Sequence, residues 1–391
     1  MSTAGDFDND GYDDIIIGAQ GKNSLHGAAY VIFGRPRSSL SNIDLSSTPL
    51  DPLTTGFTIL GNSAGDVLGC SVGTAGDINN DGYDDIIIGG FGENSNQGEA
   101  FVIYGAPKSS SLNIDLSTAS LNYLTTGFSI RGEATLNYLG RWVSTAGDVN
   151  ADGYDDILIG AYGNLAKKGA AYVIYGGPKP SLPNIDLGSI SLDPATTGFT
   201  IRGNAAGDVF GASVSNAGDI NNDGYDDIII GAHDKDFSTG ADTGAAYVIY
   251  GGEKSSMSNI NLASIALDPL TTGFTIGGNS ASDMLGRAVG KAGDMNKDGY
   301  NDIIVGAYGK SAAYVIYGGP KSSMLDIDLS TTILDKLATG FMITGNSASD
   351  NFGISVNIAG DIDKNGYADI IIGAHSKDSG KGAAYVVHTG K

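Results

Sequence analysis

One acidic motif in this sequence could bind a metal ion, and the chain repeats it six times. The first copy is a nine-residue loop with Asp6, Asp8, Asp10 and Asp14 at positions 1, 3, 5 and 9, Gly11 at position 6 and Tyr12 at position 7. Side chains at positions 1, 3 and 5 can converge on one point, the glycine permits a sharp turn, and position 7 can offer its backbone carbonyl. The carboxylate at position 9 closes this cage. Many oxygen ligands without sulfur or nitrogen are typical of Ca²⁺ rather than of zinc, copper or Mg²⁺.

The other five copies keep the same ligand types and exchange one aspartate for asparagine, which removes a charge but keeps an oxygen. The residues at positions 1, 3, 5, 7 and 9 are Asp77, Asn79, Asp81, Tyr83 and Asp85; Asp148, Asn150, Asp152, Tyr154 and Asp156; Asp219, Asn221, Asp223, Tyr225 and Asp227; Asp294, Asn296, Asp298, Tyr300 and Asp302; Asp361, Asp363, Asn365, Tyr367 and Asp369. The sequence therefore predicts about six Ca²⁺ sites, one in each loop.

Two other interpretations of the acidic loop were weighed against calcium binding. Asn, Asp and Gly also favour turns without any metal, but a turn gains nothing from three or four carboxylates crowded together in every copy. An EF-hand or a dockerin-type loop needs an acidic residue at position 12, where the first copy has Ile17, and an EF-hand also needs flanking helices. The recurrent aspartate at position 9 thus favours a calcium loop between strands.

The regular spacing of the loops shows that the chain is built from repeats. Successive copies begin 71, 71, 71, 75 and 67 residues apart. The variation lies in one connection, between the aliphatic run that follows the loop and the next A-A-Y or E-A-F. Only an exposed hairpin tip can gain or lose four residues without moving what flanks it.

Each repeat is predicted to form four short strands. They are F/L-G-x-x-V, the aliphatic run, A-A-Y-V-I-Y-G and G-F-T-I-x-G, which are rich in β-branched and aromatic residues. Runs such as Ile86-Ile87-Ile88 do not alternate, as expected of strands covered on both faces. We therefore predict an all-β fold, a β-propeller of four-stranded blades in which residues 1–391 form one domain of six repeats of about 71 residues. A linear solenoid is the alternative, but its repeats are shorter.

The two ends of the sequence do not complete the pattern. No F-G-x-x-V precedes Asp6, and no G-F-T-I strand follows Val387. We expect one strand to be missing at each end, so that the chain forms six blades with irregular closure or part of a seven-bladed ring. For the same reason, we expect the first loop to be the least firmly anchored.

The order of the strands assigns the connections to two faces. The metal loops join strands 1 and 2, and the long connections between strands 3 and 4 share their face because antiparallel strands alternate in direction. These connections carry Lys108, Lys179, Lys254 and Lys321. The 2-to-3 hairpins and 4-to-1 links share the opposite face, which varies most in length, notably at residues 233–243. Variable loops on a repeated scaffold favour partner recognition.

These motifs resemble a known family. The unit F-G-x-S-V, A-G-D-x-N-x-D-G-Y-x-D, I-I-I-G-A and A-A-Y-V-I-Y-G is similar to the FG-GAP repeat of integrin alpha-subunit β-propellers and of their bacterial and protist relatives. The resemblance covers essentially the whole chain. It implies Ca²⁺ in the loops between strands 1 and 2, and an extracellular or cell-surface adhesion or interaction module. An acidic loop in nearly every copy is more similar to the microbial relatives.

Composition limits the function classes. The formal net charge is −22, which disfavours binding to nucleic acid, and the apolar runs are too short to insert into a membrane. Six filled loops would bring the charge to −10. The single Cys70 excludes disulfides and cysteine-based metal sites, and no signal peptide is recognisable in MSTAGDFDND. The N-terminus therefore predicts either a route other than secretion by a signal peptide or a chain that is part of a longer one.

The sequence does not predict an enzyme. The four histidines, His26, His233, His375 and His388, have no neighbours that would orient them for catalysis, and we expect no copy to place unique acids or bases at the central channel of the propeller. We expect a calcium-binding module that binds a protein or glycan partner through a loop face. The alternatives are a structural spacer, or an accessory propeller of a larger surface protein or carbohydrate-active enzyme.

Overall fold

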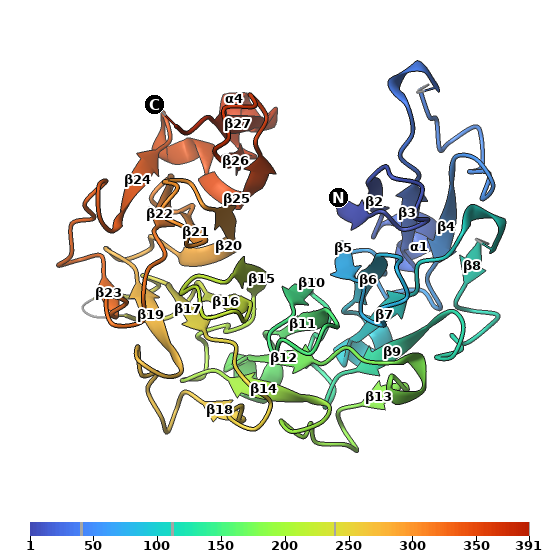
Figure 1. Ribbon diagram of the computed structural model, residues 1–391, viewed down its shortest axis with the longest axis horizontal. Helices are drawn as coiled ribbons and strands as arrows, with labels where there is room; N and C mark the ends of the chain where they lie inside the picture. The colour runs from blue at the N-terminus through green and yellow to red at the C-terminus, as the bar shows by residue number, and fades with distance from the viewer. Residues whose placement is uncertain (40–41, 111–112, 238–239, 391) are drawn as a thin grey trace. The chain divides into compact units, whose positions relative to one another are not determined.

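The protein is almost entirely β-structure. The computed structural model describes residues 1–39, 42–110, 113–237 and 240–390, and its strands form six sheets of three to five strands, one for each repeat (Figure 1). Within the first, second, fourth, fifth and sixth repeats, the main strands pair antiparallel in chain order, as in a propeller blade. This confirms the predicted all-β propeller fold. That the chain is a single domain stays a prediction.

The described strands divide among the repeats as follows. The first repeat has β1 (Ser2–Gly5), β2 (Asp14–Gly18), β3 (Ala28–Ile32) and β4 (Gly56–Leu60), and the second has β5 (Ser71–Gly76), β6 (Asp85–Gly90), β7 (Glu99–Ile103), β8 (Ile114–Asp115) and β9 (Gly127–Arg131). The third has β10 (Trp142–Gly147), β11 (Asp156–Ala161), β12 (Ala170–Ile174), β13 (Ile185–Asp186) and β14 (Gly198–Arg202), and the fourth has β15 (Ser213–Gly218), β16 (Asp227–Ala232), β17 (Ala245–Ile249), β18 (Ile260–Asn261) and β19 (Gly273–Gly277). The fifth has β20 (Leu285–Gly293), β21 (Asp302–Ala307), β22 (Ala312–Ile316), β23 (Ile327–Asp328) and β24 (Gly340–Thr344), and the sixth has β25 (Phe352–Gly360), β26 (Asp369–Ala374) and β27 (Ala383–Val387).

Helical structure is confined to single turns in the connections. Four-residue turns α1 (Lys22–Leu25), α2 (Glu93–Asn96), α3 (Asn164–Lys167) and α4 (Lys377–Gly380) lie in the 2-to-3 hairpins, and 3₁₀ turns η1 (Arg37–Ser39), η2 (Lys108–Ser110), η3 (Lys179–Ser181) and η4 (Ala348–Asp350) lie in other connections. The first three 3₁₀ turns occur in the 3-to-4 connections. Part of the predicted 233–243 hairpin, residues 238 and 239, lies outside the described residues.

The 3-to-4 connection contributes a short strand that the sequence did not predict. In the second repeat, β8 pairs in parallel with β4 of the first sheet, with Ile114 opposite Ile59. The same happens with β13 on β9, β18 on β14 and β23 on β19. The second, third, fourth and fifth repeats thus each add an outer strand to the sheet before them, so these neighbouring blades are joined by backbone hydrogen bonds as well as by packing.

The first sheet corrects one expectation. Ser2–Gly5 forms β1 and pairs antiparallel with β2, so strand 1 is present ahead of Asp6 and the first loop is held between two paired strands. The F-G-x-x-V motif was also placed too early in the second to fourth repeats. There the described strand 1 begins at the residue before the valine, for example at Ser71, and runs through the A-G that precedes the metal loop.

The core lies between successive sheets. Chain contacts divide the protein into two compact units, residues 1–145, 153–164 and 173–198 in one and residues 146–152, 165–172 and 199–391 in the other. In the first unit, Ile86 and Ile88 of β6 pack in one cluster with Phe57 and Ile59 of β4. Ile86, Ile87 and Ile88 are all fully buried, which confirms that the aliphatic run is covered on both faces.

Candidate metal centre

The aspartate at position 1 shapes each loop. In the first loop, Asp6 accepts hydrogen bonds from the backbone N–H groups of Asp10 and Gly11 at 2.9 and 2.8 Å. Asp77, Asp219, Asp294 and Asp361 accept the equivalent pairs in their loops. The glycine at position 6 adopts a positive φ, +87° at Gly11, which a residue with a side chain rarely adopts. Asp6 and Gly11 therefore fold the loop back on itself.

The aspartate at position 9 fixes the loop to the sheet. Asp14 accepts hydrogen bonds from Phe7 N–H on one oxygen and from Gly34 N–H on the other, at 3.1 and 2.6 Å. This carboxylate is almost completely buried in all six repeats. Burial raises the pKa of Asp14 and of Asp302 to about 7, because the charged form loses its water. A nearby cation would favour the ionised carboxylate in place of the proton.

Position 3 offers oxygen atoms that the protein leaves open. Both oxygens of Asp8 are buried and accept no hydrogen bond from the described residues, although Lys108 Nζ lies 3.1 Å from Oδ2. In the fourth loop, Asn221 donates through Nδ2 to Asp227 at 3.0 Å, and its buried Oδ1 has no partner among the described residues. A buried acceptor without a donor is costly, so these atoms fit a metal-ligand role.

The predicted ligands of the first loop converge. Carboxylate oxygens of Asp6, Asp8 and Asp10 lie within 4.8 Å of one another, close enough to bind one ion. In the third loop, Asp148 and Asp152 belong to one compact unit and Asp156 to the other. The backbone N–H of Asp152 donates to the carboxylate of Asp148 at 3.1 Å, as the equivalent groups do in the other loops. Oxygen-only ligands around one point fit a hard cation such as Ca²⁺, which these carboxylates would hold and which would neutralise their charge.

Each of the first four loops contacts a lysine from the following repeat. Lys179 Nζ lies 2.8 Å from Asp81 Oδ2, at position 5 of the second loop. Lys108 on Asp10, Lys254 on Asp152 and Lys321 on Asp223 make the same contact at 2.5, 2.5 and 2.7 Å. The ammonium of Lys179 also lies 4.8 Å from the ring centre of Tyr104. These contacts confirm that the metal loops and the 3-to-4 connections emerge on the same face.

A second contact joins neighbouring loops through position 8. Asp84, in the second loop, accepts a hydrogen bond from the backbone N–H of Asp6 at 2.8 Å. Asp155 and Asp226 accept the equivalent bonds from Asp77 and Asp148. Asn301 makes a related contact by donating through Nδ2 to the backbone oxygen of Asp219. The first four acidic loops are therefore held by a side chain of the next repeat as well as by their own strands.

The sixth loop has a different partner. His388 Nδ1 lies 3.2 Å from Asp369 Oδ2 and 3.8 Å from Asp363 Oδ2, and these three residues form the second group of converging ligands among the described residues. Other repeats have Tyr or Phe at the position of His388, for example Tyr317. The sequence alone did not indicate this role, although the position directly follows strand 3 in every repeat.

The four lysines should weaken calcium binding while stabilising the metal-free loops. Replacing Lys108, Lys179, Lys254 and Lys321 with glutamine removes a competing cation from each position-5 carboxylate. We expect the calcium affinity of these sites to rise by up to about fivefold, since partly exposed ion pairs contribute up to about 1 kcal/mol each. The metal-free variant should melt at a lower temperature than the parent.

The control is a variant with the same net charge change, in which Lys22, Lys168, Lys336 and Lys381 become glutamine. Calcium titrations of both variants separate a local effect from a change in total charge. Equal affinities in the two variants would show that the lysines act only through net charge.

Comparison with known proteins agrees with this geometry. The model of the FG-GAP repeat matches residues 2–32, 139–174, 210–249, 285–317 and 352–387. The chain is 32% identical to integrin alpha pat-2 of Caenorhabditis elegans over 240 residues. This alignment covers 59% of this chain and 17% of that protein. It is 29% identical to integrin alpha-8 of Gallus gallus, over 61% of this chain and 22% of that protein. Integrin alpha-4 of Xenopus laevis is 26% identical over 79% of this chain and 25% of its own length.

The chain thus spans between 17% and 25% of the length of these relatives. The matched ranges fall in the first, third, fourth, fifth and sixth repeats, and they contain the acidic loops and strands described above. Together with the six-sheet fold, they confirm the family resemblance that the motifs indicate. The chain belongs to the FG-GAP repeat proteins, in an integrin alpha-like form.

Proposed function

We propose that the protein is a calcium-binding β-propeller module that binds a protein or glycan partner at a cell surface or outside the cell. The observation that carries the proposal is the repetition of the acidic loop on one face, with open oxygen atoms at position 3. The similarity to integrin alpha subunits supports an interaction module in general. No helix in the described part of the chain is long and apolar enough to span a membrane.

The protein is expected to bind about six Ca²⁺ ions, one for each loop. Native mass spectrometry of protein exchanged into a volatile buffer with micromolar calcium would count them. Replacing Asp77 with alanine should remove one ion, because it removes both a ligand and the side chain that folds the second loop. A count of two or fewer in the parent protein would contradict one site for each loop.

The hairpin face is our proposed partner surface, and its fourth copy offers two acids, the half-buried Asp234 and the exposed Asp236. Within this hairpin, Lys235 is buried and lies 3.0 Å from Asp208, and Phe237 covers Gly277. Shortening the hairpin would therefore damage packing. Reversing the charge of Asp234 and Asp236 to lysine is the sharper change.

We expect this double variant to lose binding to a partner found by screening glycans and matrix proteins in calcium. The control is Glu253→Lys, an exposed acid in a 3-to-4 connection on the other face. If Glu253→Lys abolishes binding and the hairpin variant does not, the binding surface is the face that carries the acidic loops and the 3-to-4 connections.

A non-catalytic role is part of the proposal. His233 is mostly buried, and its burial, together with the Arg287 charge, lowers its pKa to about 4, so that it stays neutral at physiological pH. The alternative is a structural or accessory propeller of a larger protein. It is supported by the comparison with integrin alpha subunits, because the chain aligns with only 17% and 22% of the length of two of them. Failure to bind any partner with and without calcium would favour that alternative.

A further inference from the structure

An ion pair with a buried aspartate recurs on the hairpin side of the later repeats. An aspartate of the 4-to-1 link meets a lysine at the start of the next 2-to-3 hairpin. The pairs are Asp208 with Lys235 at 3.0 Å, Asp283 with Lys310 at 3.5 Å and Asp350 with Lys377 at 3.1 Å. All three aspartates are at least nine-tenths buried. In the fourth, fifth and sixth repeats, this slot thus holds one carboxylate and one cation.

The second repeat keeps the aspartate and replaces the lysine with an acid. Asp66 stands at the aspartate position and Glu93 at the lysine position. The backbone of the slot is unchanged, because Gly92 N–H donates to Asp66 O at 3.0 Å, just as Gly309 N–H donates to Asp283 O at 3.2 Å. Asp66 also accepts a hydrogen bond from Ser63 N–H, and Asp283 accepts the equivalent one from Ser280. Two carboxyl groups therefore occupy the space that a carboxylate and an ammonium share elsewhere.

Glu93 is deeply buried and incompletely satisfied. Its exposed fraction is 3%, that of Asp66 is 5%, and Glu93 Oε1 accepts no hydrogen bond from the described residues. Burial first, and then the neighbouring Asp66 carboxylate, raise the pKa of Glu93 to about 9. A buried carboxyl pair of this kind must hold either a proton or a cation, because two unpaired charges in one buried slot are too costly.

A third acid from the same repeat adds negative charge nearby. Glu99 stands where the other repeats have alanine, for example Ala170 and Ala245, and its charge also acts on Glu93. Arg131 Nε lies 3.8 Å from Glu99 Oε2 and offsets one of these charges. The whole chain has only four glutamates, and two of them belong to this group. The second repeat therefore differs from the other repeats by two glutamates on its hairpin side.

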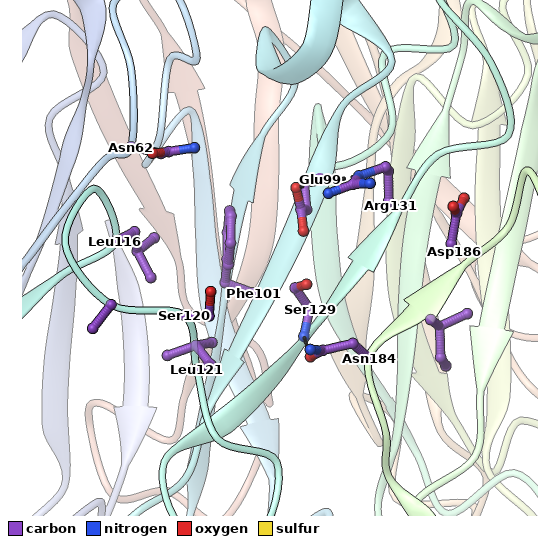
Figure 2. A pocket seen from close by; sticks show the side chains of 12 residues that line it. Asn62, Glu99, Phe101, Leu116, Ser120, Leu121, Ser129, Arg131, Asn184 and Asp186 are labelled. Carbon is purple, nitrogen blue, oxygen red and sulfur yellow. Dashed lines mark hydrogen bonds and ion pairs between the residues drawn. The ribbon is translucent and has the colours of Figure 1, made fainter.

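One acid of this group, Glu99, lines a pocket. Glu99 and Arg131 lie side by side in the wall of a cavity of about 270 Å³, which Asn62 and Phe101 also line (Figure 2). Asn62 belongs to the same 4-to-1 link as Asp66. The pocket thus reaches this group of acids at Glu99, whose charge acts on Glu93.

We propose that the slot formed by Asp66 and Glu93 is a further cation site, in which Ca²⁺ takes the place that a lysine ammonium holds in the fourth, fifth and sixth repeats. Those lysines show that a positive charge fits at this position. The ligand atoms are carboxylate oxygens alone, which favour a hard divalent cation over a transition metal. The site is separate from the acidic loops, because it lies on the hairpin side of the repeat.

Glu93→Lys tests the site, since it restores the pair that the later repeats contain. We expect this variant to bind one Ca²⁺ fewer than the parent protein when both are counted by equilibrium dialysis with radioactive calcium at pH 8. In the presence of chelator, it should melt at a higher temperature than the parent, because the new ammonium pairs with Asp66. Glu253→Lys, an exposed glutamate with the same charge change, should leave the count unchanged.

Glu93→Gln separates a bound ion from a shared proton. If the slot holds Ca²⁺, this variant loses one ion and also loses part of the stabilisation that calcium gives the parent. If Glu93→Lys, Glu93→Gln and the parent all bind the same number of ions, the slot holds a proton and the proposal is wrong. The comparison is a difference between variants, so it does not depend on how many acidic loops are filled.

Discussion

Removing calcium should lower the melting temperature of this protein by roughly 15–30 °C. A site kept at a hundredfold excess of ligand over its dissociation constant contributes about 2.7 kcal/mol, so three filled loops contribute about 8 kcal/mol. For a compact unit of roughly 200 residues, each 1 kcal/mol shifts the melting temperature by about 2–4 °C. Calcium binding to the unfolded chain would reduce this effect, so the figure is an upper estimate.

The physical reason is the clustering of acids that nothing else fully neutralises. In the first loop, Asp6, Asp8 and Asp10 converge, and a single ammonium, that of Lys108, contacts the last two. Without a divalent ion, these carboxylates repel one another, and Asp14 must carry a proton or stay charged in a buried place.

Calorimetry in millimolar calcium and in excess chelator would measure the shift, with restoration by added calcium as the control for irreversible damage. Magnesium should restore less, since it prefers a smaller and more rigid octahedral site. Equal melting temperatures with calcium and with chelator would contradict calcium as a structural element of the fold.

The repetition explains why so much of the fold could be predicted from the sequence. Six copies of one spacing identify the strands, their order and the two faces, because a sheet of about 70 residues for each repeat leaves few other arrangements. The buried run Ile86-Ile87-Ile88 and the hairpin lengths follow from local patterns. Each of these features is encoded within a single repeat.

The features that were missed depend on contacts between repeats. Lys179 lies 98 residues from its partner Asp81, and no local pattern shows that the two meet. The short strand β8 pairs with β4 of the preceding sheet, so its own sequence gave no sign of a partner. Glu93 was overlooked because its meaning appears only when its position is compared with Lys235, Lys310 and Lys377. The same comparison between copies would have found it.

The contact between neighbouring blades also explains the glycine that ends the aliphatic run. A Cβ atom placed on Gly89, in β6, would lie 1.8 Å from the carbonyl oxygen of Gly140 in the next repeat. The equivalent contacts are Gly18 on Gly69 at 2.0 Å, Gly231 on Gly286 at 1.9 Å and Gly306 on Gly353 at 2.0 Å. The F-G motif and the I-I-I-G motif therefore meet as backbone against backbone, and no side chain fits between them.

Gly89→Ala should accordingly destabilise the protein by about 3 kcal/mol or more, at the upper end of what overpacking costs, because the atom that the new methyl group meets is backbone and cannot rotate away. The two blades would have to separate, so urea unfolding should show a lower midpoint while calcium binding to the remaining loops is retained in the folded fraction.

The control is Gly73→Ala in the adjacent strand β5, where the nearest atom to a new Cβ is 3.9 Å away. That variant should unfold within about 0.5–1 kcal/mol of the parent, since alanine is tolerated where space exists and the φ angle is ordinary. If Gly89→Ala and Gly73→Ala unfold at the same urea concentration, the close approach of the two glycines does not hold the blades together.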